Sequence, residues 1–356
     1  MSVSTQFENL GDALIHREVI RLASNHGDVL VDWSRCPKDF RDTLALTGLS
    51  RVRTIESRAR FQSALLTSRL RNRRTILLAK PGAYIRGRGV GPMKAKAILA
   101  YYGFLNALGV EQMKFGVSYE KLTQNHLDFL VAKSRTYAKH YVRGQSSLDY
   151  ARKSGMTIDG VLPDLAFNLF ETEPTQPRKV QYPLRVAFSF RDGQYDGQTE
   201  DLVAFVRTTL KTIGSENVAS VRLVSQVSWD AKTMELIADR LKQDGWPTIE
   251  LFDVHKSLKD ARHVYSESDI LFSNRLHSLL ICATVTPHII AAIDRTYNEK
   301  LADLFDTNGW SSYVVDIGNT DQEIIKRRLE HAIEVPIEGG LIKDELVKGF
   351  ADAISL

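Results

Sequence analysis

The feature that most constrains the fold is a regular alternation of short apolar runs and longer helical stretches from Leu184 to Ile333. The runs are rich in β-branched residues, which is typical of parallel strands joined by helices. This pattern predicts a Rossmann-like domain. We expect its strands at Leu184–Phe190, Ser220–Val224, Thr248–Phe252, Asp269–Phe272, His288–Ala292 and Ser312–Asp316. We expect its helices at Glu200–Thr212, Ala231–Gln243, Ser257–Ser266, Leu276–Ala283, Asn298–Asp306 and Asp321–Ile333.

The first half of the chain shows a similar but less regular pattern, which predicts a second Rossmann-like domain. We expect helices there at Asp12–Ala23, Met93–Leu108 and Ser146–Ser154, and strands at Thr75–Ala79, Met113–Val117 and Thr136–Val142.

Chain length and three prolines predict where the two domains meet. At 356 residues the chain exceeds what one hydrophobic core usually supports. Pro174, Pro177 and Pro183 discourage both helix and central strand, which indicates a linker. We expect an N-terminal domain, this linker, a C-terminal domain and a last helix that packs back toward the first domain, at residues 1–170, 171–183, 184–335 and 336–356.

Composition indicates a globular protein in a reducing compartment. Apolar residues make up 43% of the chain and charged residues 25%, which is ordinary. Cys36 and Cys282 are the only cysteines, and their spacing supports neither a disulfide framework nor a zinc site. The chain opens without an export signal, and no apolar run approaches the roughly 18 residues that span a bilayer. We therefore expect a cytoplasmic protein.

Positive charge is concentrated in one segment. The net charge is only +4, but eight arginines lie between residues 51 and 74, where Glu56 is the only acidic residue. This favours an anionic surface or ligand. Two arrangements are open. Phe61, Leu65 and Leu66 could face lipid while the arginines meet head groups of the inner membrane, or they could lie in the core beneath a solvated helix face.

Side chains suited to chemistry follow the strand Asp269–Phe272 and begin the next helix. In an open α/β sheet, ligands bind beyond the carboxyl ends of the strands, where a helix N-terminus also offers free N–H groups. Arg275 can grip a carboxylate or phosphate with two N–H groups, and His277 can exchange a proton near neutral pH. Alternatively, Arg275 makes a surface ion pair and His277 is an ordinary helix residue. The position favours a ligand site that also includes Asn274 and Ser278.

Two further cations follow neighbouring strands. Arg191 comes directly after the strand Leu184–Phe190, and Lys300 lies beyond His288–Ala292. Each is a weak signal alone, since a lone charge beside a turn is usually solvated. A second guanidinium at the same edge predicts a ligand with more than one negative group.

Three segments of the first domain contain candidate residues of the cleft, of which Arg143 is a candidate for donor binding and the others are candidates for the acceptor side. Asn9, Gly11 and Asp12 open the first helix, where glycine permits close backbone approach and Asp12 more simply caps the helix. Arg143 follows a strand-like run and opens another helix. Asp164 is either a turn residue, which is the simpler account, or a carboxylate of the cleft.

The loop at residues 86–91 is rich in glycine and arginine. It does not follow its strand directly, so it does not predict a dinucleotide site. We interpret it as a mobile basic lid whose Arg86 and Arg88 meet anionic groups of an acceptor. The sequence contains no HExxH, GxSxG, GxxxxGKS or paired-cysteine motif, and we expect neither a metal nor a cofactor.

Four segments together resemble the polysaccharide pyruvyl transferase family. They are ENLGDALI, VRGQSSLDYARKSG, VLPDLAFNL and SNRLHSLLICATVTPHIIAAID, of which the RLHS helix start is the most specific. The resemblance implies two Rossmann-like domains in a glycosyltransferase-B-like arrangement with a cleft between them. It further implies phosphoenolpyruvate as donor, a hydroxyl pair of a glycan or lipid-linked oligosaccharide as acceptor, and a role in exopolysaccharide or capsule biosynthesis at the cell envelope.

The resemblance also implies roles for individual residues. Arg275 and His277 match the donor site of the family, and Arg191 resembles its arginine after the first strand of the second domain. The remaining matches are Asn9, Gly11 and Asp12 in the opening motif, Arg143 before the serine-rich helix start, and Lys300 as the late lysine. Residues 79–84 replace the glycine-rich turn that is common in relatives, which leaves the acceptor open.

The implied chemistry agrees with these residue types. Phosphoenolpyruvate carries a carboxylate and a phosphate close together, so cations at adjacent strand ends suit its binding. Ketal formation requires proton delivery to the enol methylene, attack by a hydroxyl and loss of phosphate, and His277 suits the proton delivery. Two alternatives stay open: a glycosyltransferase that uses a nucleotide-activated sugar, and a non-catalytic protein that binds polyanions or a membrane surface. We expect no nucleic-acid partner.

Overall fold

The chain folds into two compact α/β units. The computed structural model describes residues 1–3, 5–85, 89–170, 180–191, 198–286, 288–318 and 321–355. Unit 1 comprises Met1–Phe7, Asp12–Asn168 and Asp344–Leu356, and unit 2 comprises Glu8–Gly11 and Leu169–Lys343. Most of the expected linker at 171–183 lies outside the described residues.

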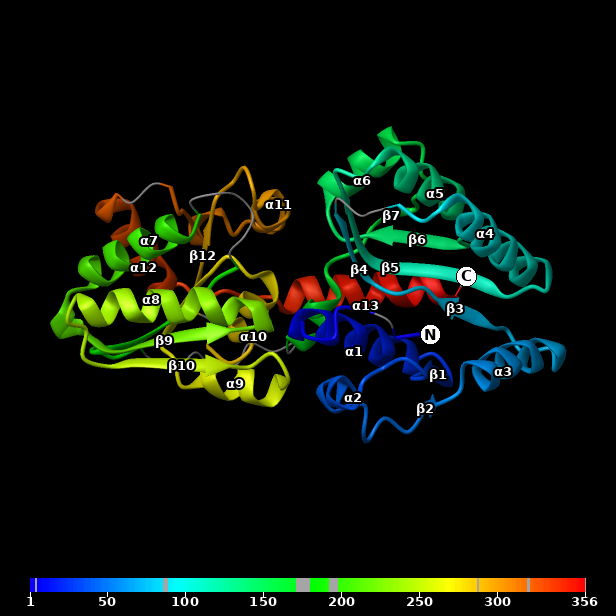
Figure 1. The fold of residues 1–356 in the computed structure, drawn as a ribbon, viewed down its shortest axis with the longest axis horizontal. Coiled ribbons are helices and arrows are strands. Elements are labelled where there is room, and N and C mark those ends of the chain that lie inside the picture. The colour runs from blue at the N-terminus through cyan, green and yellow to red at the C-terminus, as the bar shows by residue number, and fades with distance from the viewer. Residues whose placement is uncertain are drawn as a thin grey trace. The chain divides into compact units, whose positions relative to one another are not determined.

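Unit 2 contains a six-stranded parallel sheet (Figure 1). Its strands are β8 (Leu184–Ser189), β9 (Val218–Ser225), β10 (Ile249–Asp253), β11 (Ile270–Ser273), β12 (Ile289–Ile293) and β13 (Val314–Asp316). They lie in the order β10-β9-β8-β11-β12-β13, so the chain winds outward from β8 and then continues from β11 in the opposite direction. This is the doubly wound Rossmann order. Strands β11 and β12 are buried throughout, because helices cover both faces of such a sheet.

Helices fill the connections between these strands. They are α7 (Gln198–Ile213), α8 (Ala231–Gln243), α9 (Leu258–Ser266), α10 (Leu276–Ala283), α11 (Glu299–Thr307) and α12 (Gln322–Glu334). Short 3-10 helices lie at Ser215–Asn217, Ser228–Asp230 and Ser311–Tyr313. The helix α10 is buried from Ser278 to its end, which agrees with its apolar sequence. The predicted strands and helices of this half are confirmed, each within two residues of its expected bounds.

Unit 1 contains a five-stranded parallel sheet and a separate parallel pair. The five strands are β3 (Ile76–Leu78), β4 (Gly82–Ile85), β5 (Glu111–Glu120), β6 (Lys139–Val142) and β7 (Gly160–Val161), and the pair is β1 (Val29–Asp32) with β2 (Val52–Ile55). Both β3 and β4 pair with β5, one after the other along its length, and β6 also pairs with β5. The β5–β6 register shifts between Lys114 and Val117, where Gly116 has φ +64°. This is a bulge that a glycine accommodates.

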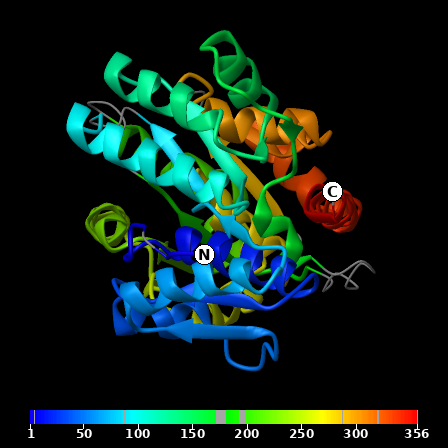
Figure 2. The same ribbon diagram turned by 90° about the vertical axis from the view of Figure 1, so that its right-hand side faces the viewer.

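The helices of unit 1 flank its sheets. They are α1 (Leu10–Ser24), α2 (Lys38–Leu44), α3 (Arg58–Leu70), α4 (Pro92–Ala107), α5 (Gln124–Ser134), α6 (Gln145–Lys153) and α13 (Gly340–Ser355), with a 3-10 helix at Leu165–Leu169. Figure 1 shows α4, α5 and α6 on one side of the five-stranded sheet and α13 on the other. Phe350 of α13 packs on Phe115 of β5 with ring centroids 4.6 Å apart. Figure 2 views α13 almost end-on.

The arginine-rich segment forms α3, whose apolar side faces inward. Phe61 and Leu65 are only 3% and 6% exposed and lie in a core with residues of β3 and α4 and with the residue just before β5, and Leu66 packs against the same cluster. The arrangement in which these residues face lipid is therefore wrong. The alternative, a helix over a hydrophobic core, is confirmed.

Carboxylates from other elements neutralise part of this basic segment. Arg58 pairs with Asp32 of β1 at 2.6 Å, and Arg74 pairs with Glu111 of β5 at 2.8 Å. Local sequence could not reveal these pairs, because the partners are distant in the chain. In the part of the chain that the structure describes, no helix combines the length and apolar character needed to cross a bilayer.

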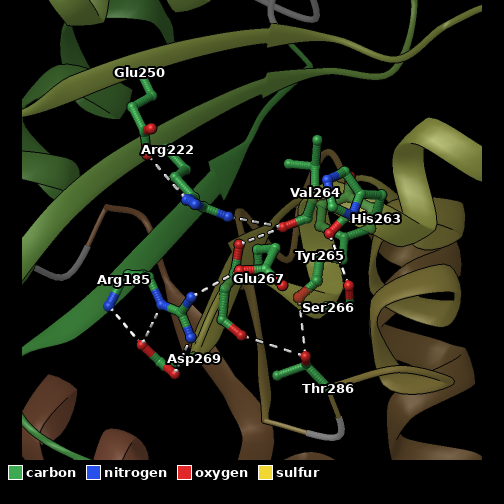
Figure 3. Close-up of polar contacts among 11 residues, drawn as sticks. Arg185, Arg222, Glu250, His263, Val264, Tyr265, Ser266, Glu267, Asp269 and Thr286 are labelled. Atoms are coloured by element: carbon green, nitrogen blue, oxygen red, sulfur yellow. Dashed lines mark hydrogen bonds and ion pairs between the residues drawn. The ribbon is translucent and has the colours of Figure 1, made fainter.

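Figure 3 shows charged side chains that pair with one another in unit 2. Asp269, just before β11, accepts hydrogen bonds from the backbone N–H of Arg185 at 2.7 Å and from its Nε at 3.2 Å. Glu267 adds a bond of 3.0 Å to the same guanidinium. Since Arg185 is the second residue of β8, these pairs tie two neighbouring strands together at their amino ends. The carboxyl ends of the same strands carry a different set of polar groups.

Candidate functional site

The site lies at the carboxyl ends of β8 and β11, the neighbouring strands at which the winding direction of the unit 2 sheet reverses. Open α/β sheets bind ligands at such a switch point. Asn274 joins the two strand ends, because its Oδ1 accepts from the Arg191 backbone N–H at 2.6 Å and its Nδ2 donates to the Arg191 carbonyl at 2.9 Å. The structure thus brings together Arg191 and Asn274, which the sequence placed after two different strands.

Serine hydroxyls fix the start of α10. The Ser273 hydroxyl donates to the Ser189 carbonyl at 2.5 Å and accepts from the Arg275 backbone N–H at 2.9 Å. The Ser278 hydroxyl lies 3.0 Å from that of Ser189 and donates to Oε1 of Gln226 at 2.7 Å. These buried bonds orient the first turn of α10 rigidly, and with it Arg275 and the following residues.

Arg275 is nearly buried and paired with an acid that the sequence analysis missed. Its side chain is 11% exposed and forms an ion pair with Asp230, which is 1% exposed and ends the 3-10 helix after β9. Burial raises the pKa of Asp230, and the guanidinium beside it opposes that rise. Burial likewise lowers the pKa of Arg275, and the positive charge of Arg191 contributes to this lowering. The sequence signal for Asp230 is its position after a strand, β9.

The segment Glu8–Gly11 belongs to unit 2 and reaches the same site. Asn9 forms an antiparallel bridge with Val227, and the Ser228 hydroxyl donates to Glu8 at 2.5 Å. The Oδ1 of Asn9 accepts from the Gly11 backbone N–H at 3.0 Å.

Gly11 lies directly against His277. A Cβ atom added to Gly11 would lie 2.2 Å from Nδ1 of His277 and 3.0 Å from Nε2 of Gln226. The site therefore requires a residue without a side chain at this position. Gly11 of the NxGD segment and His277 of the RLHS segment, which are far apart in the sequence, meet here.

The structure also places the remaining candidate residues. Lys300 is in the first turn of α11, which follows β12, the strand next to β11. Asp12 lies in unit 1, where its carboxylate accepts from the Thr5 hydroxyl and from the backbone N–H of Gln6 at 3.4 Å. It therefore binds the segment before α1. Arg86 and Arg88 lie outside the described residues.

Arg143 and Asp164 form a buried pair within unit 1. Their side chains are 14% and 1% exposed, and they are joined by a bond of 2.6 Å. Asp164 also accepts from the backbone N–H of Ala166 at 2.9 Å, as a turn residue does. Arg143 donates in addition to the Ser118 hydroxyl at 2.5 Å. The turn contact of Asp164 agrees with the simpler account, its role as a carboxylate of the cleft stays a prediction, and Arg143 is held at the carboxyl end of β6.

No group of three or more histidine, cysteine, aspartate or glutamate side chains within the described ranges is arranged to hold a metal ion. The polar groups of the site are instead two guanidinium groups, a carboxylate, an amide and an imidazole. Side chains of these types can recognise a small anion with directional hydrogen bonds and exchange a proton with it.

The sequence model of the polysaccharide pyruvyl transferase family matches residues 100–286. The chain belongs to this family. The match includes Asp230, Arg275 and His277, and it also includes the Arg143–Asp164 pair of unit 1. No curated protein matches the sequence.

Solved structures similar to this pyruvyl transferase family member span both of its units. A putative UDP-N-acetylglucosamine 2-epimerase from Listeria monocytogenes has a TM-score of 0.54 at 10% identity, and the similarity covers 99% of this chain and 95% of the epimerase. The apo structure of OtsA has a TM-score of 0.50 at 10% identity and covers 99% and 94% of the two chains. At this identity the similarity concerns the fold alone. The expected fold class, an α/β protein with parallel sheets of the glycosyltransferase-B-like type, is confirmed.

Proposed function

We propose that this protein transfers pyruvate from phosphoenolpyruvate to a pair of sugar hydroxyls on a glycan, forming a cyclic ketal and releasing phosphate. Family membership supports pyruvyl transfer and a glycan substrate. The observation that carries the proposal is the contact of Gly11 with His277 beside the Arg275–Asp230 pair, at the switch point of the unit 2 sheet. A small anion bound there meets a proton donor and two guanidinium groups at once.

We assign donor binding to the groups around β8 and β11. Asp230 holds Arg275 in place and neutralises its charge. The other N–H groups of Arg275 can then bind and orient a carboxylate or phosphate by hydrogen bonding. Arg191 and Lys300 then supply the net positive charge that a donor with two anionic groups requires. Asn274 and Ser278 hold the strand ends and the first turn of α10, so they position the donor site.

We assign His277 as the general acid. It delivers a proton to the methylene carbon of the donor, so the enol carbon becomes electrophilic and is attacked by the first sugar hydroxyl. Breaking the bond to the phosphate oxygen releases phosphate, and the second hydroxyl then closes the ketal. Of the two hydroxyl protons lost, one balances the proton delivered to carbon and the other leaves with phosphate. Guanidinium groups stabilise the departing phosphate.

We assign Asn9 and Gly11 to the same site and consider Asp12 and Asp164 part of the acceptor side. We place the reaction in the cytoplasm, because the two cysteines of this chain are buried free thiols, which favours a reducing compartment. Its product would serve exopolysaccharide or capsule synthesis at the cell envelope.

The substitution His277→Ala tests the proposal. We expect turnover, measured as phosphate release from phosphoenolpyruvate with a panel of glycans, to fall by about 10²–10⁴, the range for a general acid. Donor affinity, measured by calorimetry, should change little, because the arginines do most of the binding. In deuterated water the wild-type protein should label the pyruvyl methyl group of the product.

His263→Ala is the matched control, since His263 is an exposed residue of α9. It should retain full turnover. Normal turnover in His277→Ala would contradict the proposed role of His277. If the wild-type protein released no phosphate from phosphoenolpyruvate with any glycan of the panel, pyruvyl transfer itself would be contradicted.

A further inference from the structure

A cavity of about 280 Å³ lies within unit 1, bounded by side chains of β3, β4, β5, α3, α4 and α5. This is near the lower end of the range of roughly 300–1,000 Å³ for small-molecule sites, which suits a ligand with one sugar ring. Tyr84, Tyr101 and Tyr102 line the cavity, and so do five cationic side chains, whereas none of the described residues that line it carries a carboxylate.

Lys114 of β5 is the most unusual of these residues. It is 1% exposed, and its Nζ donates to the Tyr84 hydroxyl at 3.2 Å and lies 4.3 Å from the centre of that ring. Within the described residues no carboxylate forms an ion pair with it, although an ammonium group has three donors. A buried charge without a counter-ion is costly, and burial accordingly lowers the pKa of Lys114 to about 7.

A second ammonium group faces the same cavity. The Nζ atom of Lys133 on α5 lies 4.5 Å from the ring centre of Tyr102. Burial, followed by the positive charge of Lys114, lowers the pKa of Lys133 to about 8. Lys80, after β3, adds further repulsion. Folding alone gives no reason to gather like charges around an open cavity, because they destabilise one another. An anion in the cavity would relieve this repulsion.

We propose that this cavity binds a monosaccharide unit that carries a carboxylate or a phosphate. Lys114 and Lys133 would hold the anionic group, and the tyrosine rings would contact the apolar face of the sugar while their hydroxyls meet its polar edge. The site itself depends only on contacts within unit 1. That this sugar is part of the acceptor glycan rests on the proposed function.

Calorimetry on the full chain without phosphoenolpyruvate tests the site. The probes are glucuronate, glucose 6-phosphate, glucose and inorganic phosphate. We expect at least one of the two sugar anions to bind at least about tenfold more tightly than glucose, as expected for hydrogen bonds to a charged group, and more tightly than phosphate alone. The tighter of the two identifies the anionic group. Equal binding of glucose, equal binding of phosphate, or binding of neither sugar anion would overturn the proposal.

The substitution Lys114→Met removes the buried ammonium group and keeps an apolar side chain of similar length. We expect affinity for the sugar anion to fall by about 10- to 100-fold. Lys153→Met, at an exposed position of α6, is the matched control and should leave the affinity unchanged. Thermal unfolding verifies that both variants fold. Unchanged affinity for the sugar anion in Lys114→Met would overturn the assignment of Lys114. Phosphoenolpyruvate binding by the same variant should stay at the wild-type level, and this measurement tests the proposed function separately from the sugar site.

The pH dependence of glucuronate binding gives a second readout. A bound anion favours protonated Lys114, so binding takes up a proton. Affinity should be constant below pH of about 7 and fall as pH rises above it, by up to about tenfold per pH unit. Lys133 adds to this fall near pH 8. The other charged or titratable groups near Lys114 are Lys80, Tyr84, Tyr119, Tyr137 and His140.

Burial lowers the pKa of His140 to about 3 and raises the pKa values of Tyr119 and Tyr137 well above their usual range, so these groups stay neutral over the pH range tested. The Lys114→Met variant should lose the fall near pH 7. Affinity independent of pH in the wild-type protein would contradict a role for Lys114.

Discussion

At the scale of single residues, the contact between Gly11 and His277 gives the most direct test of the site geometry. A methyl group at Gly11 would lie 2.2 Å from Nδ1 of His277, so Gly11→Ala must displace the imidazole. A displacement of about 1 Å at a catalytic group costs roughly 10² in rate. We expect Gly11→Ala to lower turnover by about that factor and to change donor affinity little, measured as kcat and KM for phosphate release.

Gly27→Ala is the control for the general effect of adding a methyl group. Apart from its own residue and its two chain neighbours, no atom lies within 4 Å of the added Cβ at Gly27, so turnover and stability should stay near the wild-type values. If Gly11→Ala retained full turnover, the position of His277 would not matter for the reaction.

The residues of the site were predictable to the extent that they follow strands. Arg191, Asn274 and His277 each lie just after or near the end of a predicted strand, and the sheet brings those ends together. Asp230 also follows a strand, β9, but its pairing with Arg275 was not predictable, because the two residues are 45 positions apart and meet only in the folded unit. The Arg143–Asp164 pair was not predictable either, because it too forms only in the folded unit, although each residue was a candidate on its own.

At the scale of strands and helices, the amino and carboxyl ends of β8 and β11 have different roles. Asp269 and Arg185 tie β8 to β11 at their amino ends (Figure 3), whereas the carboxyl ends carry the candidate site. Removing a charge at the amino ends should therefore affect stability and leave donor binding intact.

The substitution Asp269→Asn is expected to lower the free energy of opening of β8 and β11 by about 1–3 kcal/mol, because it weakens bonds to a partly buried guanidinium group. Hydrogen exchange of the amides of these strands measures this change. Glu267→Gln, which changes a 49% exposed partner of the same arginine, should cost less than about 1 kcal/mol. A loss of phosphoenolpyruvate affinity in Asp269→Asn, without loss of stability, would contradict this division of tasks.

Elements were predictable where apolar strands alternate regularly with helices that have a buried stripe. The unit 2 elements follow this pattern, although β11 and β13 have only four and three residues, and the ten-residue β5 is long enough to be recognised without it. The elements missed in unit 1 are β1, β2, β4, β7, α2 and α5. The strands among them have at most four residues, and β2 exposes both Arg53 and Thr54, so their alternation is too short to detect. Pairing within the folded unit, rather than local preference, decides their structure.

At the scale of the whole molecule, the two units are expected to bind different anions. The donor site depends on contacts within unit 2, and the Lys114 cavity depends on contacts within unit 1. A ligand stabilises the unit that binds it, by about 2.7 kcal/mol at a concentration of 100 times Kd. Amides that exchange by opening of that unit then exchange about 100-fold more slowly.

Hydrogen exchange with each ligand in turn should therefore separate the two sites in the full chain. We expect phosphoenolpyruvate, added in the presence of a chelator, to slow exchange in β8, β11 and α10, because arginines rather than a metal ion hold it. The sugar anion identified by calorimetry should slow exchange in β3, β5 and α4. His277→Ala should retain the first effect, whereas Lys114→Met should lose only the second. Protection of unit 2 that appears only with added magnesium would contradict metal-free donor binding, and protection of unit 2 rather than unit 1 by the sugar anion would place that ligand at the donor site.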